Sequence, residues 1–161
     1  MTFKLRDYQQ KIIDDVILQL KKGHKKILVV LPTGGGKTAI STDLTSRCHN
    51  KGKSINFICH RRELITQTYK TYLKNGITPS FIAGNRRYDK ANTIQIASIN
   101  TLVNRISALA PPDVCFWDEC HHQAASQWEK VFREYGSSVH IGLTATPVRL
   151  DGKPLGKFYD A

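Results

Sequence analysis

The stretch KKILVVLPTGGGKT, residues 25–38, joins an apolar run to a glycine-rich turn that ends in a lysine and a threonine. A continuous apolar run of this length predicts a strand buried on both faces. Glycines let the following turn wrap closely around an anion, and the N-terminus of the next helix adds positive potential. We interpret residues 31–38 as a phosphate-binding loop in which Lys37 reaches the β- and γ-phosphates of a nucleotide and Thr38 binds Mg²⁺.

One position departs from the general phosphate-loop pattern. That pattern has a glycine six residues before the lysine, and Leu31 occupies this place. A glycine-rich turn with a chance Gly-Lys-Thr is the alternative interpretation. The strand–loop–helix context disfavours it, because a phosphate loop requires that context.

The rest of the chain alternates between apolar runs and amphipathic stretches. This order, without tight hairpin signals, predicts an α/β fold with a mostly parallel sheet and helices on both faces. Polar segments follow the strands or sit at their ends, and in such sheets they meet at the carboxyl edge, where ligands bind. Strands are expected at about 25–32, 54–59, 80–83, 93–98, 113–119 and 138–145, and helices at about 8–20, 37–49, 61–73, 100–109 and 125–135.

Two carboxylates, Asp118 and Glu119, end the apolar run DVCFWDE. A phosphate loop needs an acid at the end of a partner strand to help hold Mg²⁺. We expect Asp118 to do so through a water molecule, since Mg²⁺ keeps much of its hydration. Glu119 could accept a proton from the attacking water. Zinc is the alternative cation, but Cys120 and the two histidines after it are consecutive and cannot easily close a tetrahedron.

Composition bounds the remaining possibilities. A chain of 161 residues is long enough for one domain with a real core. No apolar stretch approaches the roughly 20 residues of a membrane span, and the N-terminus lacks a signal-peptide core. The four cysteines show no CxxC pair, so reduced thiols are expected. We therefore expect a cytoplasmic, intracellular protein with no membrane partner.

The net charge of +11 is unevenly distributed. Residues 1–112 hold 19 Lys and Arg against 6 Asp and Glu, a net charge of +13, and residues 113–161 hold 5 against 7, a net charge of −2. This asymmetry favours a polyanion-binding face, and solvated surface lysines are the alternative. Arg61 and Arg62 also favour a polyanion-binding face. They fall in the first turn of a predicted helix, where cations are unfavourable unless an anion binds there. Salt bridges to a neighbouring loop would be the alternative.

Several motifs together resemble superfamily 2 helicases. DECH at 118–121 resembles their motif II, in a DECH-box variant of the DEAD/DEAH type. PTGGGKT resembles motif I, in which Pro-Thr-Gly commonly replaces the first glycine, and LTATP at 143–147 resembles motif III. The continuation VRLDGKPLG is similar to the branch that contains restriction-enzyme translocases and repair helicases. The resemblance covers residues 4–156, with the motifs in family order.

This resemblance implies a RecA-like P-loop domain, the first motor domain of an ATP-dependent helicase or translocase. ATP and Mg²⁺ would be its cofactors and nucleic acid its partner, DNA being favoured and RNA possible. It also assigns residues: Arg6 and Gln9 to the adenine; Pro32, Thr33, Gly34, Gly35, Gly36, Lys37 and Thr38 to the phosphates; Lys37, Asp118 and Glu119 to catalysis; Thr38 and Asp118 to the metal; His121, Thr144 and Thr146 to coupling; Arg61, Arg62, Ser98 and Thr101 to nucleic acid.

Such motors place ATP between two RecA-like domains. We expect residues 1–161 to form the first domain alone, with the second, which carries the arginine finger, supplied in cis or in trans. The isolated chain should then be nearly inactive as an ATP hydrolase. The alternative function is a nucleotide-gated nucleic-acid-binding module without motor activity. A P-loop kinase or transferase is a wider alternative, and it should lack the ordered DECH and TATP boxes.

Overall fold

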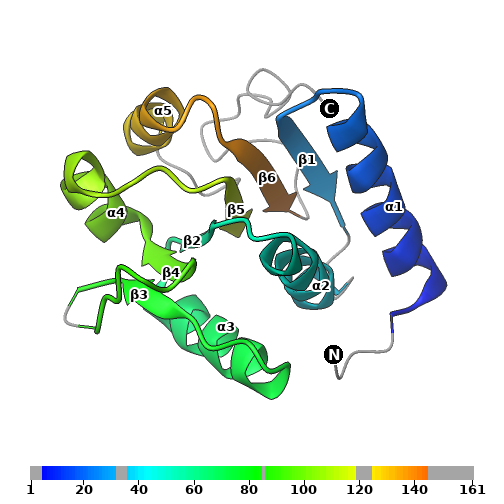
Figure 1. The fold of residues 1–161 in the computed structure, drawn as a ribbon, viewed down its shortest axis with the longest axis horizontal. Helices are drawn as coiled ribbons and strands as arrows, with labels where there is room; N and C mark the ends of the chain where they lie inside the picture. The colour runs from blue at the N-terminus through cyan, green and yellow to red at the C-terminus, as the bar shows by residue number, and fades with distance from the viewer. Residues whose placement is uncertain (1–4, 32–35, 85, 119–124, 145–161) are drawn as a thin grey trace.

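A computed structural model describes residues 5–31, 36–84, 86–118 and 125–144, and these form a single sheet flanked by helices (Figure 1). The predicted alternation of helices and strands is confirmed over these residues. The helices are α1 (Asp7–Lys21), α2 (Lys37–Asn50), α3 (Arg62–Lys74), α4 (Ile99–Arg105), the 3₁₀ turn η1 (Ile106–Ala108) and α5 (Ala125–Glu134). The strands are β1 (Lys26–Val30), β2 (Ile55–Cys59), β3 (Ser80–Ile82), β4 (Ile94–Ser98), β5 (Val114–Asp118) and β6 (Val139–Thr144).

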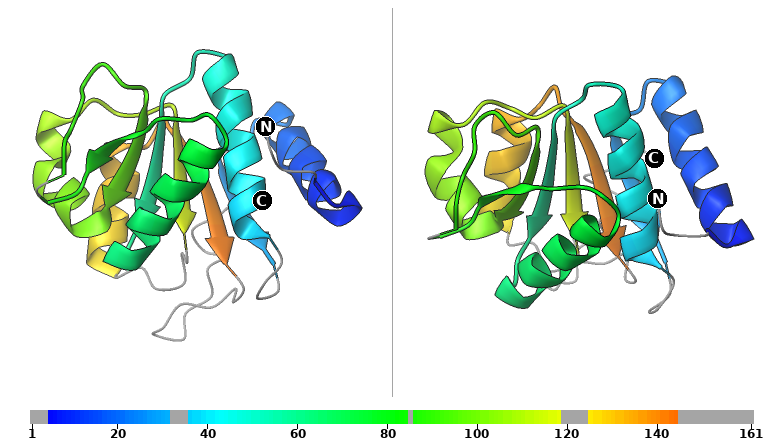
Figure 2. Two further views of the ribbon diagram at one scale, coloured as in Figure 1. Left: turned by 90° about the horizontal axis from the view of Figure 1, so that it is seen from below. Right: turned by 60° about the horizontal axis from the view of Figure 1, so that its bottom comes forward.

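The six strands are all parallel and follow the order β1-β6-β5-β2-β4-β3. The strand that precedes the phosphate loop therefore pairs with the last described strand, and the chain between them forms the rest of the sheet. Because every strand runs in the same direction, all their carboxyl ends lie along one edge (Figure 2). The predicted parallel sheet is confirmed.

Helices cover both faces of the sheet, as predicted. α1, α2 and α3 pack on one face around a core that includes Ile13, Ile40 and Phe57. α4 and α5 pack on the other face, where Trp117 is 2% exposed and lies in a second core cluster. Trp117 is therefore a packing residue of this core. The predicted helix 100–109 is shorter than expected, because its last turn tightens into η1 ahead of Pro111.

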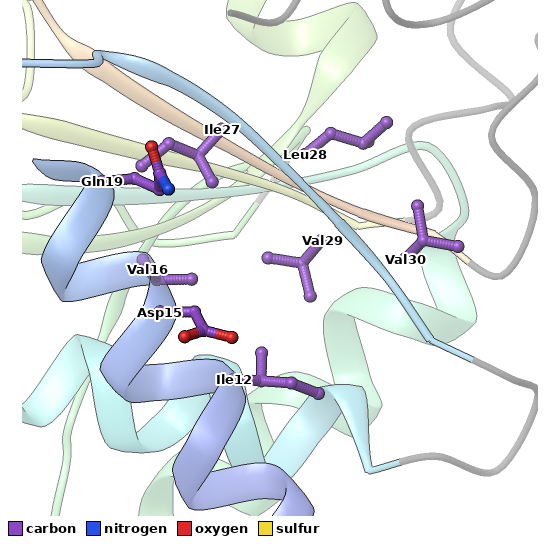
Figure 3. A pocket seen from close by; sticks show the side chains of 8 residues that line it. All are labelled: Ile12, Asp15, Val16, Gln19, Ile27, Leu28, Val29 and Val30. Atoms are coloured by element: carbon purple, nitrogen blue, oxygen red, sulfur yellow. The ribbon is translucent and has the colours of Figure 1, made fainter. Parts of the chain in front are cut away.

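The α1 helix leaves a pocket of about 310 Å³ where it meets β1. Figure 3 shows Ile12 and Val16 of α1 and Val29 of β1 pointing toward one another across it. β1 is the edge strand on this side of the sheet, and the side chain of Val30 at its end is 49% exposed. Among the described residues no helix is both long and apolar enough to cross a membrane.

Candidate nucleotide site

Lys37 and Asp118, 81 positions apart in the sequence, meet at the carboxyl edge of the sheet. Lys37 is the first residue of α2 and Asp118 the last residue of β5. Lys37 Nζ lies 3.8 Å from Asp118 Oδ1, and the two side chains are 21% and 12% exposed. Burial raises the pKa of the Asp118 carboxyl, and the nearby Lys37 charge acts in the opposite direction. A cation and a carboxylate therefore face each other at low exposure, the charges that a phosphate and a divalent metal would each require.

Gly36, the residue before α2, lies against α1. Gly36 has a φ of +85°, in the left-handed region that glycine adopts most readily, and it caps the N-terminus of α2. A Cβ at this position would overlap Gln9 Nε2 and would lie 3.7 Å from the Tyr8 hydroxyl. Gln9 is 6% exposed, and its Oε1 accepts a hydrogen bond of 2.9 Å from the Arg6 backbone N–H. Gln9, one of the two predicted adenine residues, thus lies against Gly36, and the other, Arg6, is bonded to Gln9.

A cavity of about 170 Å³ opens beside Lys37, Thr38 and Asp118. Its opposite wall includes Gln67 and Thr68 of α3. The sequence did not mark these α3 residues as site residues. With Leu64 and Thr71, which also line the cavity, they follow the i, i+3, i+4, i+7 spacing of one helical face. That periodicity alone does not distinguish a cavity wall from a core contact.

Thr144 lies next to the start of the phosphate loop. It is fully buried at the end of β6, and its carbonyl accepts a hydrogen bond of 2.9 Å from the Leu31 N–H. Leu143, the residue before it, pairs with Asp118 in the sheet register. The end of β6 therefore touches both the loop and the acidic strand end, which is where a residue that couples them would have to lie.

The four predicted nucleic-acid residues gather at the ends of β2 and β4, which are paired with Cys59 opposite Ser98. Arg61 caps the N-terminus of α3 in an extended conformation, Arg62 is its first residue, and both are exposed. Ser98 caps α4, and Thr101 Oγ1 accepts a hydrogen bond of 3.1 Å from the Gly84 N–H.

Arg86, in the loop after β3, makes two contacts with neighbouring elements. It donates a hydrogen bond of 2.8 Å to Thr66 Oγ1 and stacks over the Phe81 ring at 5.0 Å. The first contact ties the loop to α3, and the second packs it against β3.

The remaining predicted site residues lie outside the described residues. They are Pro32, Thr33, Gly34, Gly35, Glu119, His121 and Thr146. Their assignments remain predictions.

Residues 2–149 match the family described as "Type III restriction enzyme, res subunit". The chain is 30% identical over 156 residues to "Type I restriction enzyme EcoAI endonuclease subunit" of Escherichia coli, with 88% of this chain and 19% of that protein covered. It is 29% identical over 152 residues to "DNA 3'-5' translocase XPB2" of Sulfurisphaera tokodaii, with 93% of this chain and 32% of that protein covered. The chain thus spans less than a third of either relative.

Solved structures share the fold. The "Sulfolobus solfataricus SWI2/SNF2 ATPase core in complex with dsDNA" superposes with a TM-score of 0.73 at 17% identity, covering 91% of this chain and 33% of that chain. At this identity the likeness concerns the arrangement of strands and helices.

Proposed function

Because this chain belongs to the family of type III restriction enzyme res subunits, within the superfamily 2 helicases, we propose that its residues form the ATP-binding motor domain of a DNA helicase or translocase. Its fold is the N-terminal RecA-like α/β fold of that superfamily. The single observation that carries the proposal is the approach of Lys37 to Asp118 at the carboxyl edge of the sheet. A module that only binds nucleic acid would not need this charge pair beside a phosphate loop.

The proposed chemistry assigns one task to each residue around the cavity. Lys37 moves from Asp118 to the β- and γ-phosphates of ATP, which present more negative charge than one carboxylate. Thr38 and Asp118 would hold the Mg²⁺ of such ATP sites, an ion that neutralises phosphate charge when bound. The donors fit this ion, since a hydroxyl and a carboxylate are hard oxygen ligands. Glu119 is the proposed proton acceptor for the attacking water.

DNA is the proposed polymer. The support is the basic character of residues 1–112, the exposed Arg61 and Arg62 at the start of α3, and the relatives whose names include a DNA translocase and a restriction enzyme. Binding of phosphates at a helix N-terminus would turn the unfavourable arginine–dipole interaction into a favourable one.

Replacement of Lys37 by alanine tests the nucleotide site. Lys37→Ala should weaken Mg-ADP binding by about tenfold to a hundredfold, because a charged hydrogen bond to phosphate contributes roughly 1.5–3 kcal/mol. Isothermal titration calorimetry on the 161-residue protein measures the affinity.

Lys70→Ala is the matched control, since Lys70 is an exposed lysine on α3 that does not line the cavity. The melting temperature should be similar for all three proteins, as Lys37 is not a core residue. Equal ADP affinity in the Lys37→Ala and Lys70→Ala proteins would contradict the phosphate-loop assignment.

A further inference from the structure

A separate pocket lies at the edge of the sheet where the strands begin, opposite the edge that carries Lys37 and Asp118. Its volume is about 300 Å³, the lower end of the range for small-molecule sites. It is lined by residues at the starts of β2 and β4 and by the segments that precede β4 and β5. Asn56 is level with Cys115 in the sheet register, three residues before Asp118, so this level lies about 10 Å from the nucleotide edge.

Two buried amide side chains line this pocket side by side. Asn56 and Gln95 are paired in the register of β2 and β4, and they are 5% and 6% exposed. Two amides at such low exposure are costly unless a ligand or water completes their hydrogen bonds.

The orientation of the Gln95 amide is set by its neighbours. Its Nε2 donates to the Asp89 and Asn92 carbonyls, each at 2.9 Å, and only an N–H group can face two carbonyl oxygens. The other atom of the amide, Oε1, is therefore an acceptor, and it is buried without a partner. A ligand seated on this floor would have to supply a hydrogen-bond donor.

The walls and rim add aromatic, apolar and positive groups. Tyr88 lines the pocket and is 41% exposed, which leaves its ring open to a stacking partner. Leu109 and the Pro111–Pro112 pair form an apolar wall. Lys90 also lines the pocket, is exposed, and makes no ion pair with the acidic residues that the structure describes.

We propose that this pocket binds a single nucleobase with an exocyclic amino group, cytosine or adenine, with its phosphate near Lys90. The amino group of the base donates one hydrogen bond to Gln95 Oε1. Its second N–H and the adjacent ring nitrogen pair with the oxygen and the N–H₂ of the Asn56 amide, and the base stacks on the Tyr88 ring. This site goes beyond the proposed motor function, and its base could belong to a free nucleotide or to a nucleic-acid strand.

Cytidine and uridine monophosphates are a matched pair of probes. They differ at ring position 4, where cytosine carries an amino donor and uracil a carbonyl acceptor. The carbonyl of uracil would face the unpaired Gln95 Oε1, so CMP should bind at least about fivefold more tightly than UMP. Equal affinities would contradict the donor contact.

The binding experiment uses the Lys37→Ala protein, so that the nucleotide site does not take up the probe. Titration of ¹⁵N-labelled protein with CMP up to about 10 mM is followed through the side-chain amide signals of Asn56 and Gln95, which should shift and saturate. A cytidine trinucleotide is titrated in a second arm. Tighter binding of the trinucleotide indicates a strand as the source of the base, and equal binding indicates a free nucleotide.

Two variants test the location. Tyr88→Ala should weaken CMP binding by about tenfold through the loss of one stacking contact. Asn56→Leu should weaken it to a similar extent while the melting temperature holds or rises, because a side chain of similar size replaces a buried polar amide with an apolar group. Lys70→Ala should bind CMP as the parent does. No saturable shift would mean that the pocket holds only water, and unchanged binding in both variants would place the base elsewhere; either result overturns the proposal.

Discussion

Gly36 is a single residue whose conformation and contact with α1 both exclude a side chain. At φ +85° an L-residue is strained by about 1–2 kcal/mol, and a Cβ there also overlaps Gln9 Nε2. Gly36→Ala should therefore lower the free energy of unfolding by more than backbone strain alone and should weaken ADP binding. Urea unfolding and calorimetry measure the two effects.

Gly52 provides the matched control for this substitution. Its φ is +75°, and a Cβ at that position has no atom within 4 Å. Gly52→Ala should therefore show the backbone strain without the overlap and should leave ADP affinity unchanged. Equal losses of stability and unchanged ADP affinity in both variants would mean that the contact between Gly36 and Gln9 is unimportant.

His140 is a fully buried residue whose protonation state contributes to stability. Its Nδ1 accepts a hydrogen bond of 3.0 Å from Trp117 Nε1, and its Nε2 donates to the Tyr135 carbonyl at 3.0 Å. Burial, with a smaller contribution from the Lys26 charge, lowers its pKa to about 4, and the bond to Tyr135 acts in the opposite direction. In the unfolded chain its pKa is about 6.5, so the unfolded state binds the proton first as the pH falls.

The resulting stabilisation is complete above about pH 6.5 and decreases as the pH falls toward 4. Between pH 7 and pH 5 this residue alone should lower the free energy of unfolding by about 2 kcal/mol. In His140→Gln, the glutamine amide can make both hydrogen bonds but does not titrate. The free energy of unfolding of this variant should therefore fall by about 2 kcal/mol less between pH 7 and pH 5 than that of the parent protein. Urea unfolding at the two pH values makes the comparison, and parallel pH profiles would show that His140 does not titrate in this way.

At the scale of elements, the start of α3 carries positive charge where a helix disfavours it. Replacement of Arg61 and Arg62 together by alanine should weaken DNA binding similarly for all DNA sequences. The slope of log affinity against log salt concentration should become smaller in magnitude by about one to two. Stability should hold or rise slightly, since two cations leave the positive end of the helix. Fluorescence anisotropy at several salt concentrations measures the slope.

The opposite end of the same helix supplies the control. Lys70→Ala with Lys74→Ala removes the same charge near the C-terminus of α3, away from the edge where Arg61 lies. The double lysine variant should show the same salt dependence of DNA affinity as the parent protein and a slightly lower melting temperature. A lower melting temperature of the arginine variant, with an unaltered slope, would identify Arg61 and Arg62 as structural residues.

At the scale of the whole molecule, the 161-residue chain spans 19% and 32% of the two relatives described above. We expect this polypeptide alone to bind ATP weakly and to hydrolyse it far more slowly than 1 s⁻¹, with or without DNA. In such motors an arginine finger increases the rate of hydrolysis by roughly 10³ to 10⁵. In a cleft open to solvent, water also weakens the electrostatic interactions between the ATP phosphates and the protein. A phosphate-release assay, with Glu119→Gln as background, measures the rate. Turnover near 1 s⁻¹ that Glu119→Gln abolishes would contradict this prediction.

The local features of this protein follow from its sequence. The apolar run before the glycines, the amphipathic stretches and the acid that ends β5 predicted the order of elements and the α/β class, because strand and helix periodicities are encoded in neighbouring residues. The rule that parallel strands share a carboxyl edge was enough to predict that Lys37 and Asp118 belong to one site.

The tertiary structure decided which elements are neighbours. Only the folded chain shows that β1 pairs with β6, that Gln67 and Thr68 of α3 line the cavity beside Lys37, and that Asn56 lies beside Gln95. These contacts join residues far apart in the sequence, and several arrangements of the same elements satisfy the same local patterns. The packing free energy of the whole core chooses among them, and no single stretch of the sequence contains that information.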